Sequence, residues 1–131
     1  MTNDQREDFG KVVVDAAYTV HKELGPGLLE SAYELALMHE LLLRGLNVQR
    51  HIPVSLKYKD FDLGKSYEID LLVEHQIIIE VKSVVDMHPV YTAQIITYLK
   101  LHSNYLGFLI NFNVPLIKNG IKRIVYNNKS A

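Results

Sequence analysis

The chain has 131 residues, of which 48% are hydrophobic and 22% charged, with a formal net charge of −1 and no cysteine. This length suits one hydrophobic core, so we expect residues 1–131 to form a single domain. The missing cysteines exclude disulfides and thiolate metal sites and fit a cytoplasmic protein. We expect no membrane span and no signal peptide. The near-zero charge argues against a general nucleic-acid binder, which carries a basic excess.

An amphipathic helix is predicted from about Thr2 to Glu23, because apolar residues recur there at three- and four-residue spacing. Thr2 and Gln5 form the pattern of a capping box at its start. Gly25-Pro26-Gly27 ends it, since proline cannot continue a helix and glycine tolerates left-handed backbone angles.

A second helix is predicted from about Leu28 to Arg44. Its start is ambiguous, because Ser31 and Glu34 form a second capping-box pattern that would begin the helix at Ala32. Glu30 then lies inside or just outside the first turn, where the helix dipole alone favours an acid. The predicted buried stripe consists of Leu35, Met38, Leu41 and Leu42.

Alternating side chains predict a strand over Val48–Tyr58, in which Pro53 indicates an edge position or a bulge. After a turn at Lys59-Asp60, two further strands follow as a hairpin that turns around His75. The second strand of this hairpin, Ile77–Val85, is apolar on both faces, which is typical of a central strand covered on both sides.

Within this hairpin, residues whose numbers sum to 150 lie opposite each other, so Asp70 faces Glu80 and Glu68 faces Lys82. Two opposed carboxylates repel unless a cation lies between them or one is protonated. A divalent metal ion satisfies this condition. The structural alternative is an ion pair of Lys82 with Glu80 or Glu68 that serves only fold specificity, but it leaves the opposition of Asp70 and Glu80 unexplained.

The remaining chain continues the α/β pattern. A third helix is predicted from Pro89 to His102, with proline in its first turn. A strand at 106–112 follows it and runs parallel to Ile77–Val85 through a right-handed crossover. Asn119-Gly120 predicts a final hairpin with strands at 116–118 and 121–126. The histidines show no zinc-binding spacing, and His88 is expected to cap the third helix or lie at the surface.

Several motifs together resemble the GxxExxY protein family. They are Gly27-Leu-Leu-Glu30-Ser-Ala-Tyr33, Asp70, Glu80-Val81-Lys82, Gln94-x-x-x-Tyr98 and the segment Leu-Ile-Asn-Phe-Asn-Val-Pro at 109–115. This family resembles the PD-(D/E)xK nuclease superfamily. The resemblance implies an α/β fold with a three-layer-like, restriction-endonuclease-type core of order αβββαβ, a mixed central sheet and, from the pattern above, a C-terminal β-hairpin.

The resemblance also implies roles for individual residues. Asp70 and Glu80 would ligate Mg²⁺ or Mn²⁺ together with the carbonyl of Val81, while Glu30 would ligate directly or through a water. Lys82 would position the attacking water and stabilise charge on the phosphate, so the implied catalytic residues are Lys82, Glu80 and Asp70. The implied supporting residues are Gln94 and Tyr98, which would brace the site or contact substrate, and Tyr33, which would support Glu30.

The predicted function is therefore that of a divalent-metal-dependent nuclease that hydrolyses phosphodiesters in DNA or RNA. The alternative is a non-catalytic nucleic-acid-binding or protein-assembly module on a nuclease-like fold, which the near-neutral charge favours. The small size and near-zero charge also suggest a homodimer or a protein partner, and the Pro53 strand and the terminal hairpin are the sheet edges where it would bind.

Overall fold

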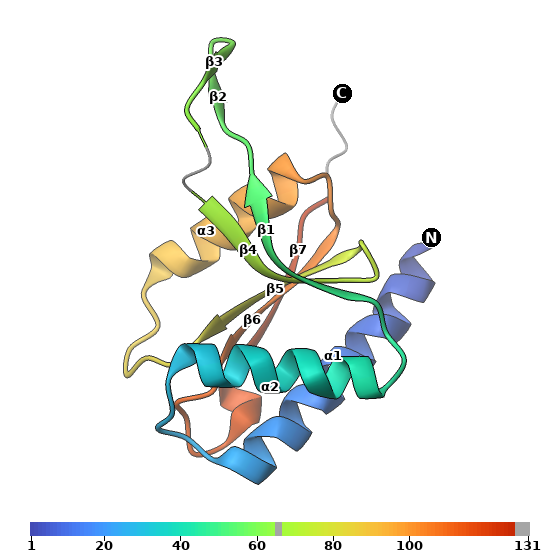
Figure 1. The fold of residues 1–131 in the computed structure, drawn as a ribbon, viewed down its shortest axis with the longest axis vertical. Helices are drawn as coiled ribbons and strands as arrows, with labels where there is room; N and C mark the ends of the chain where they lie inside the picture. The colour runs from blue at the N-terminus through green and yellow to red at the C-terminus, as the bar shows by residue number, and fades with distance from the viewer. Residues whose placement is uncertain (65–66, 128–131) are drawn as a thin grey trace.

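The computed structural model describes residues 1–64 and 67–127, in which a five-stranded sheet lies between helical layers (Figure 1). The strand order is β1-β4-β5-β6-β7, and only β5 and β6 are parallel, so the sheet is mixed as predicted. The elements are α1 (Asn3–Leu24), α2 (Glu30–Leu43), β1 (Val48–Val54), β2 (Lys57–Tyr58), β3 (Phe61–Asp62), β4 (Tyr67–Val73), β5 (Ile77–Lys82), α3 (Pro89–Leu101), β6 (Leu106–Asn111), the 3₁₀ helix η1 (Ile117–Asn119) and β7 (Ile121–Val125).

Two hydrophobic clusters cover the two faces of the sheet. One joins α1 and α2 to the face that includes Ile77 and Ile79 of β5. The other joins α3 to the opposite face, which includes Ile78. Strands β5 and β6 are central and buried almost throughout, as their two-sided apolar sequences predict. The three-layer restriction-endonuclease-type architecture is therefore confirmed.

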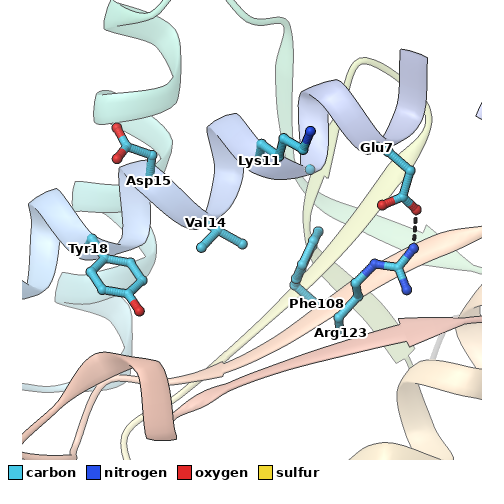
Figure 2. A pocket seen from close by; sticks show the side chains of 8 residues that line it. Glu7, Lys11, Val14, Asp15, Tyr18, Phe108 and Arg123 are labelled. Carbon is cyan, nitrogen blue, oxygen red and sulfur yellow. Dashed lines mark hydrogen bonds and ion pairs between the residues drawn. The ribbon is translucent and has the colours of Figure 1, made fainter. Parts of the chain in front are cut away.

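Helix α1 begins with the predicted capping box, in which the Thr2 side chain and the Gln5 side chain each bond the backbone of the other residue. It crosses β6 closely at Gly10, where a Cβ atom would lie 3.2 Å from Leu106 and 3.3 Å from Phe108. Glu7 pairs with Arg123 of β7 beside this crossing (Figure 2). The glycine therefore lets the first helix lie directly on β6.

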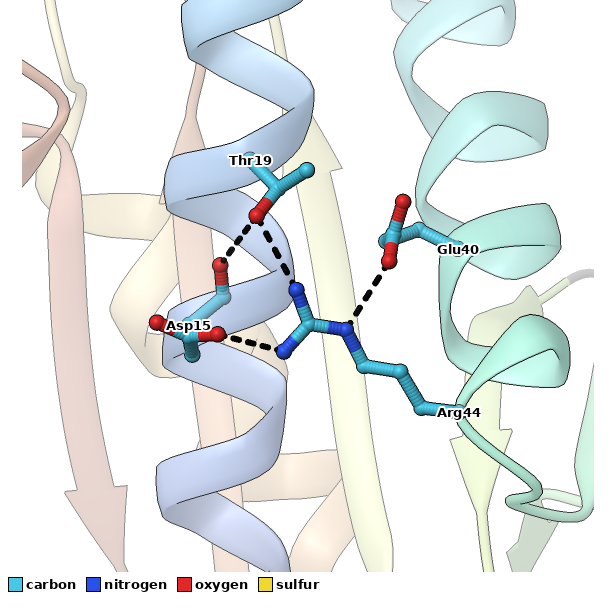
Figure 3. Close-up of polar contacts among 4 residues, drawn as sticks. All are labelled: Asp15, Thr19, Glu40 and Arg44. Carbon is cyan, nitrogen blue, oxygen red and sulfur yellow. Dashed lines mark hydrogen bonds and ion pairs between the residues drawn. The ribbon is translucent and has the colours of Figure 1, made fainter.

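At the C-terminal end of α2, Arg44 connects α2 to α1. Figure 3 shows the Arg44 guanidinium between Asp15 and Thr19 of α1 and Glu40 of α2, with Nε 2.9 Å from Glu40 and Nη2 3.0 Å from Thr19. These bonds raise the pKa of Arg44 and fix the angle between the two helices.

The predicted continuous strand Val48–Tyr58 is wrong, because β1 ends at Val54 and Lys57–Tyr58 belongs to a separate two-stranded arm with β3. The arm projects from the body of the molecule (Figure 1). Its turn residues Lys59 and Asp60 both have positive φ, which is typical of a tight two-residue hairpin. The edge position that Pro53 predicts for β1 is confirmed.

The predicted strand at 116–118 is also wrong. Residues 117–119 form the 3₁₀ helix η1, and β7 pairs with β6 instead, so the C-terminal antiparallel pair consists of β6 and β7. Gly120 has φ −100°, not the left-handed angle of an Asn-Gly hairpin turn, and its carbonyl accepts the Asn111 N–H at 2.8 Å. No helix in the described part of the chain is long and apolar enough to cross a bilayer.

Candidate functional site

The hairpin of β4 and β5 has the predicted register. Leu71 pairs with Ile79, Leu72 with Ile78 and Val73 with Ile77. At the next position Asp70 lies opposite Glu80, and hydrogen bonds from backbone N–H groups to carboxylates replace those between backbone groups. The Asp70 N–H donates to Glu80 Oε2 at 2.8 Å, and the Val81 N–H donates to Asp70 Oδ2 at 2.8 Å. Each carboxylate is thus fixed by the other strand's backbone.

Asp70 also marks a break in the pairing of β4 with β1. Residues of β1 and β4 pair on both sides of Asp70, but His51, which lies opposite Asp70, does not pair with it. His51 has φ 56°, a left-handed angle that is strained for a histidine. Residues two apart on a regular strand share a face, but here Ile69 packs on the α3 side and Leu71 on the α1 and α2 side. Regular alternation therefore ends where the carboxylates meet.

The electrostatics of this pair differ from those of surface acids. Burial, followed by the charge of Asp70, raises the pKa of Glu80 to about 8. Burial also raises the pKa of Asp70 to about 6, with further contributions from Glu34 and Glu30, while the Val81 N–H and Lys82 oppose the rise. The two carboxylates repel each other, so the folded chain favours a proton on the pair unless a cation is bound.

Helix α2 brings two acids to the site. Glu30 is its exposed first residue, and Glu34 lies one turn further on the same face and is buried. The predicted capping box of Ser31 with Glu34 is wrong, because Ser31 lies inside the helix and Leu29 caps it without a side-chain bond. Glu34 instead contacts Arg50 Nε at 3.1 Å and His51 Nε2 at 2.7 Å.

Sequence reasoning missed Glu34 as a site residue. The available signal was its four-residue spacing from Glu30, but the capping pattern gave it another role. The predicted stripe of α2 is also partly wrong, since Leu35 and Leu42 are exposed. The side that faces the sheet carries Tyr33, Glu34, Leu37 and Leu41.

Tyr33 fixes the loop that leads into α2. Its hydroxyl donates to the Gly25 carbonyl at 2.5 Å and accepts from the Leu28 N–H at 3.1 Å, while its ring stacks on Phe112 with centroids 4.7 Å apart. The Ser83 hydroxyl donates to the Leu28 carbonyl at 2.6 Å. The loop is therefore held at the end of β5, and this places Glu30 on the side of Asp70.

The alternative of an ion pair between Lys82 and Glu80 or Glu68 does not form among the described residues. Glu68 lies near His51, with the Oε2–Nδ1 distance 3.7 Å. The Lys82 ammonium lies 4.4 Å from the centroid of the Tyr91 ring in the first turns of α3. Lys82 still lowers the pKa of both Asp70 and Glu80, so its charge acts on the pair.

Helix α3 supplies the last part of the site. Tyr98 is only 5% exposed, and burial together with the charges of Glu80, Asp70 and Tyr67 raises its pKa to about 12. Gln94 lies one turn earlier on the same side, and both residues line one pocket. His88 caps the helix, since its Nδ1 accepts the Val90 N–H at 3.0 Å, in agreement with the expected capping role.

Asn111 is a second residue whose importance the sequence did not reveal beyond its place in the 109–115 motif. It is 1% exposed, and its side chain exchanges bonds with the Val84 backbone, donating to the carbonyl at 3.0 Å and accepting from the N–H at 3.1 Å. It therefore fixes the chain directly after Lys82.

The donor set fits a hard divalent cation. Carboxylate oxygens are the ligands that Mg²⁺ and Mn²⁺ prefer. Asp70 Oδ1 and Glu80 Oε1 receive no hydrogen bond from any described residue, which leaves one oxygen of each carboxylate free for a ligand. Within residues 1–64 and 67–127, however, no three His, Asp or Glu side chains already form a closed metal cluster. The candidate ligands are therefore Asp70 and Glu80, which are held by backbone hydrogen bonds, and the charges of Glu30 and Glu34 act on Asp70.

Comparison with known proteins agrees with this geometry. A family model described as the PD-(D/E)XK nuclease superfamily matches residues 7–124, which include every candidate residue above. No curated protein and no solved structure gives a significant match. The order of elements and the hairpin of β4 and β5 that carries Asp70 and Glu80 agree with this match. The chain therefore belongs to the PD-(D/E)XK nuclease superfamily.

Proposed function

We propose that this protein is a divalent-metal-dependent phosphodiesterase that cleaves nucleic acid, with Asp70, Glu80 and Lys82 as its catalytic residues. One observation carries the proposal. Asp70 and Glu80 are held together where the strands β4 and β5 separate, in surroundings that raise the pKa of both carboxyls. Such an arrangement is unfavourable in the free protein and is typical of a functional site.

Each residue has a distinct proposed role. Asp70 and Glu80 would hold Mg²⁺ or Mn²⁺ with the carbonyl of Val81, and Glu30 would complete the ligand set directly or through a water. When bound, the metal would lower the pKa of a water and offset charge on the phosphate. The charge of Lys82 acts on both carboxylates, so Lys82 serves as a positioning and charge-stabilising group for the phosphate.

The surrounding residues support this geometry. Glu34, held by Arg50 and His51, adds negative charge next to Asp70 and so strengthens the attraction for a cation. Tyr33 and Ser83 hold the loop before Glu30. Together with the motif Gly27-x-x-Glu30-x-x-Tyr33, this arrangement supports placing the chain in the GxxExxY family within the superfamily.

Cleavage assays test the proposal. Pools of single- and double-stranded DNA and RNA are incubated with the protein in Mg²⁺, Mn²⁺ or EDTA. We expect cleavage that requires the metal and is lost in Asp70→Ala and Lys82→Ala, with both variants folded by circular dichroism. Glu68→Gln, on the same hairpin but outside the carboxylate pair, is the control and should keep full activity. Cleavage that persists in both alanine variants contradicts the assignment.

The second candidate function is a non-catalytic binding or assembly module. The absence of a closed metal cluster among the described residues and the formal charge of −1 favour it. It predicts metal binding at Asp70 and Glu80 without turnover of any of the four nucleic-acid pools. A protein partner or a homodimer would then be the functional complex, which sedimentation at high concentration detects.

A further inference from the structure

A pocket of about 320 Å³ lies beside the carboxylate pair, between α3 and the adjoining ends of β1 and β4. This volume falls at the lower end of the roughly 300–1,000 Å³ found for small-ligand sites. Its walls are mostly apolar and aromatic, with a few polar groups. The lining includes Val54, Leu56, Tyr67, Gln94, Thr97 and Tyr98.

Two residues that line the pocket, Tyr67 and Tyr98, connect it to the proposed catalytic site. Tyr67 pairs with Val54 across β1 and β4 and precedes Asp70 by three residues on the same strand. Tyr98 lines the pocket from the opposite side, and the charges of Glu80 and Asp70 act on its hydroxyl. A group in the pocket would therefore adjoin a phosphate located at Glu80 and Lys82.

The chemistry of the walls suits a flat, weakly polar ring. Tyr67 is 41% exposed, so its ring is accessible for stacking. The Gln94 amide forms no hydrogen bond with any described residue, so its two donors and its acceptor are free to bond the edge of a ring. Glutamine amides pair with base edges in this way.

We infer that this pocket binds an unpaired nucleobase of the strand that the protein cleaves, with Gln94 at the base edge and Tyr67 and Tyr98 as the aromatic walls. This inference rests on the proposed function and defines its substrate class. Because a base in a duplex is stacked and paired, the substrate is single-stranded nucleic acid or a strand with a base turned outward. Stacking also supplies affinity that a net charge of −1 does not.

Nuclear magnetic resonance titrations in Mg²⁺ test the pocket directly. The probes are the four nucleoside 5′-monophosphates, in ribo and deoxyribo forms, and ribose 5-phosphate, which lacks the base. We expect saturable shifts of the Tyr67, Gln94 and Thr97 amides with at least one monophosphate and none there with ribose 5-phosphate. No shift with any monophosphate, or equal shifts with ribose 5-phosphate, overturns the inference.

Two pocket variants, Thr97→Phe and Gln94→Leu, test whether the base binds in the pocket, and Thr92→Phe is their control. Thr97→Phe fills it and should weaken monophosphate binding at least about tenfold, the loss expected when one stacked base is excluded. Thr92→Phe makes the same change on the same helix, beside Lys122 and outside this pocket, and should bind as the wild type. Gln94→Leu keeps the size of the side chain and should weaken binding even if Thr97→Phe does not fold. Unchanged affinity in the folded pocket variants overturns the inference.

Cleavage is measured separately on the same proteins. Base binding in the pocket without cleavage of any nucleic acid keeps the pocket and contradicts the nuclease proposal. Metal-dependent cleavage without base binding keeps the nuclease proposal and contradicts the pocket. The two claims therefore fail in different ways.

Discussion

Replacing Glu80 by glutamine should stabilise the metal-free protein at pH 8. The Glu80 side chain is almost fully buried, and its pKa is raised from 4.5 to about 8. At 1.36 kcal/mol for each pH unit, keeping this carboxyl ionised costs about 5 kcal/mol. Asp70 shares part of the repulsion, and an amide accepts a weaker hydrogen bond from the Asp70 N–H, so we expect a net gain of about 2 kcal/mol.

The gain should depend on pH in one direction. The folded protein binds the Glu80 proton more tightly than the unfolded chain does, so wild-type stability falls as the pH rises from about 4.5 to about 8. Glutamine removes this contribution. Urea unfolding in EDTA should therefore show little difference between Glu80→Gln and the wild type at pH 5 and the largest difference at pH 8.

Glu68→Gln is the matched control, because it makes the same change on the same hairpin at a side chain that is 55% exposed. Its stability should stay within about 0.5 kcal/mol of the wild type at both pH values. If Glu80→Gln unfolds at lower urea than the wild type at pH 8 in EDTA, the carboxylate pair is not repulsive and the argument for a cation site is refuted.

Three further predictions follow from the same contacts. Mg²⁺ or Mn²⁺ at about 100 times its Kd should stabilise the wild type by about 2.7 kcal/mol at pH 8 and far less at pH 5, as thermal unfolding measures, whereas an equal effect in Asp70→Asn would place the metal elsewhere. Tyr33→Phe keeps the stacking on Phe112 but removes the hydroxyl between Gly25 and Leu28, so urea unfolding should show a loss of about 1–3 kcal/mol, and an unchanged midpoint would contradict it. Gly120→Ala should lower stability by at least about 2 kcal/mol, because its Cβ would overlap the Asn111 carbonyl oxygen, and a fully stable variant would show that this turn relaxes freely.

Local patterns in the sequence predicted much of the fold. The alternation around His75 gives the correct register for Asp70 and Glu80, because a tight hairpin leaves few alternatives. The two-sided apolar runs give the central strands β5 and β6. The errors at Tyr58 and at 116–118 arise where short polar segments pair with partners that local propensity does not specify.

The site was less predictable than the fold. Spacing brings Asp70 to Glu80, but the break in alternation at His51 and the location of Lys82 over Tyr91 depend on contacts between separate elements. Glu34 fits a capping box in sequence and a buried ion pair in the structure, since only the packing of α2 on β1 distinguishes the two. The roles of all the candidate residues, among them Val81, Gln94 and Glu30, stay predictions.

The most direct test of the account is the anomalous scattering of Mn²⁺ in crystals grown at pH 8. We predict a peak between the side chains of Asp70 and Glu80, within ligand distance of Asp70 Oδ1 and Glu80 Oε1, and its loss in Asp70→Asn. A protein that crystallises in Mn²⁺ with no peak at this pair, or with the same peak in Asp70→Asn, would contradict the claim that the hairpin is a metal site.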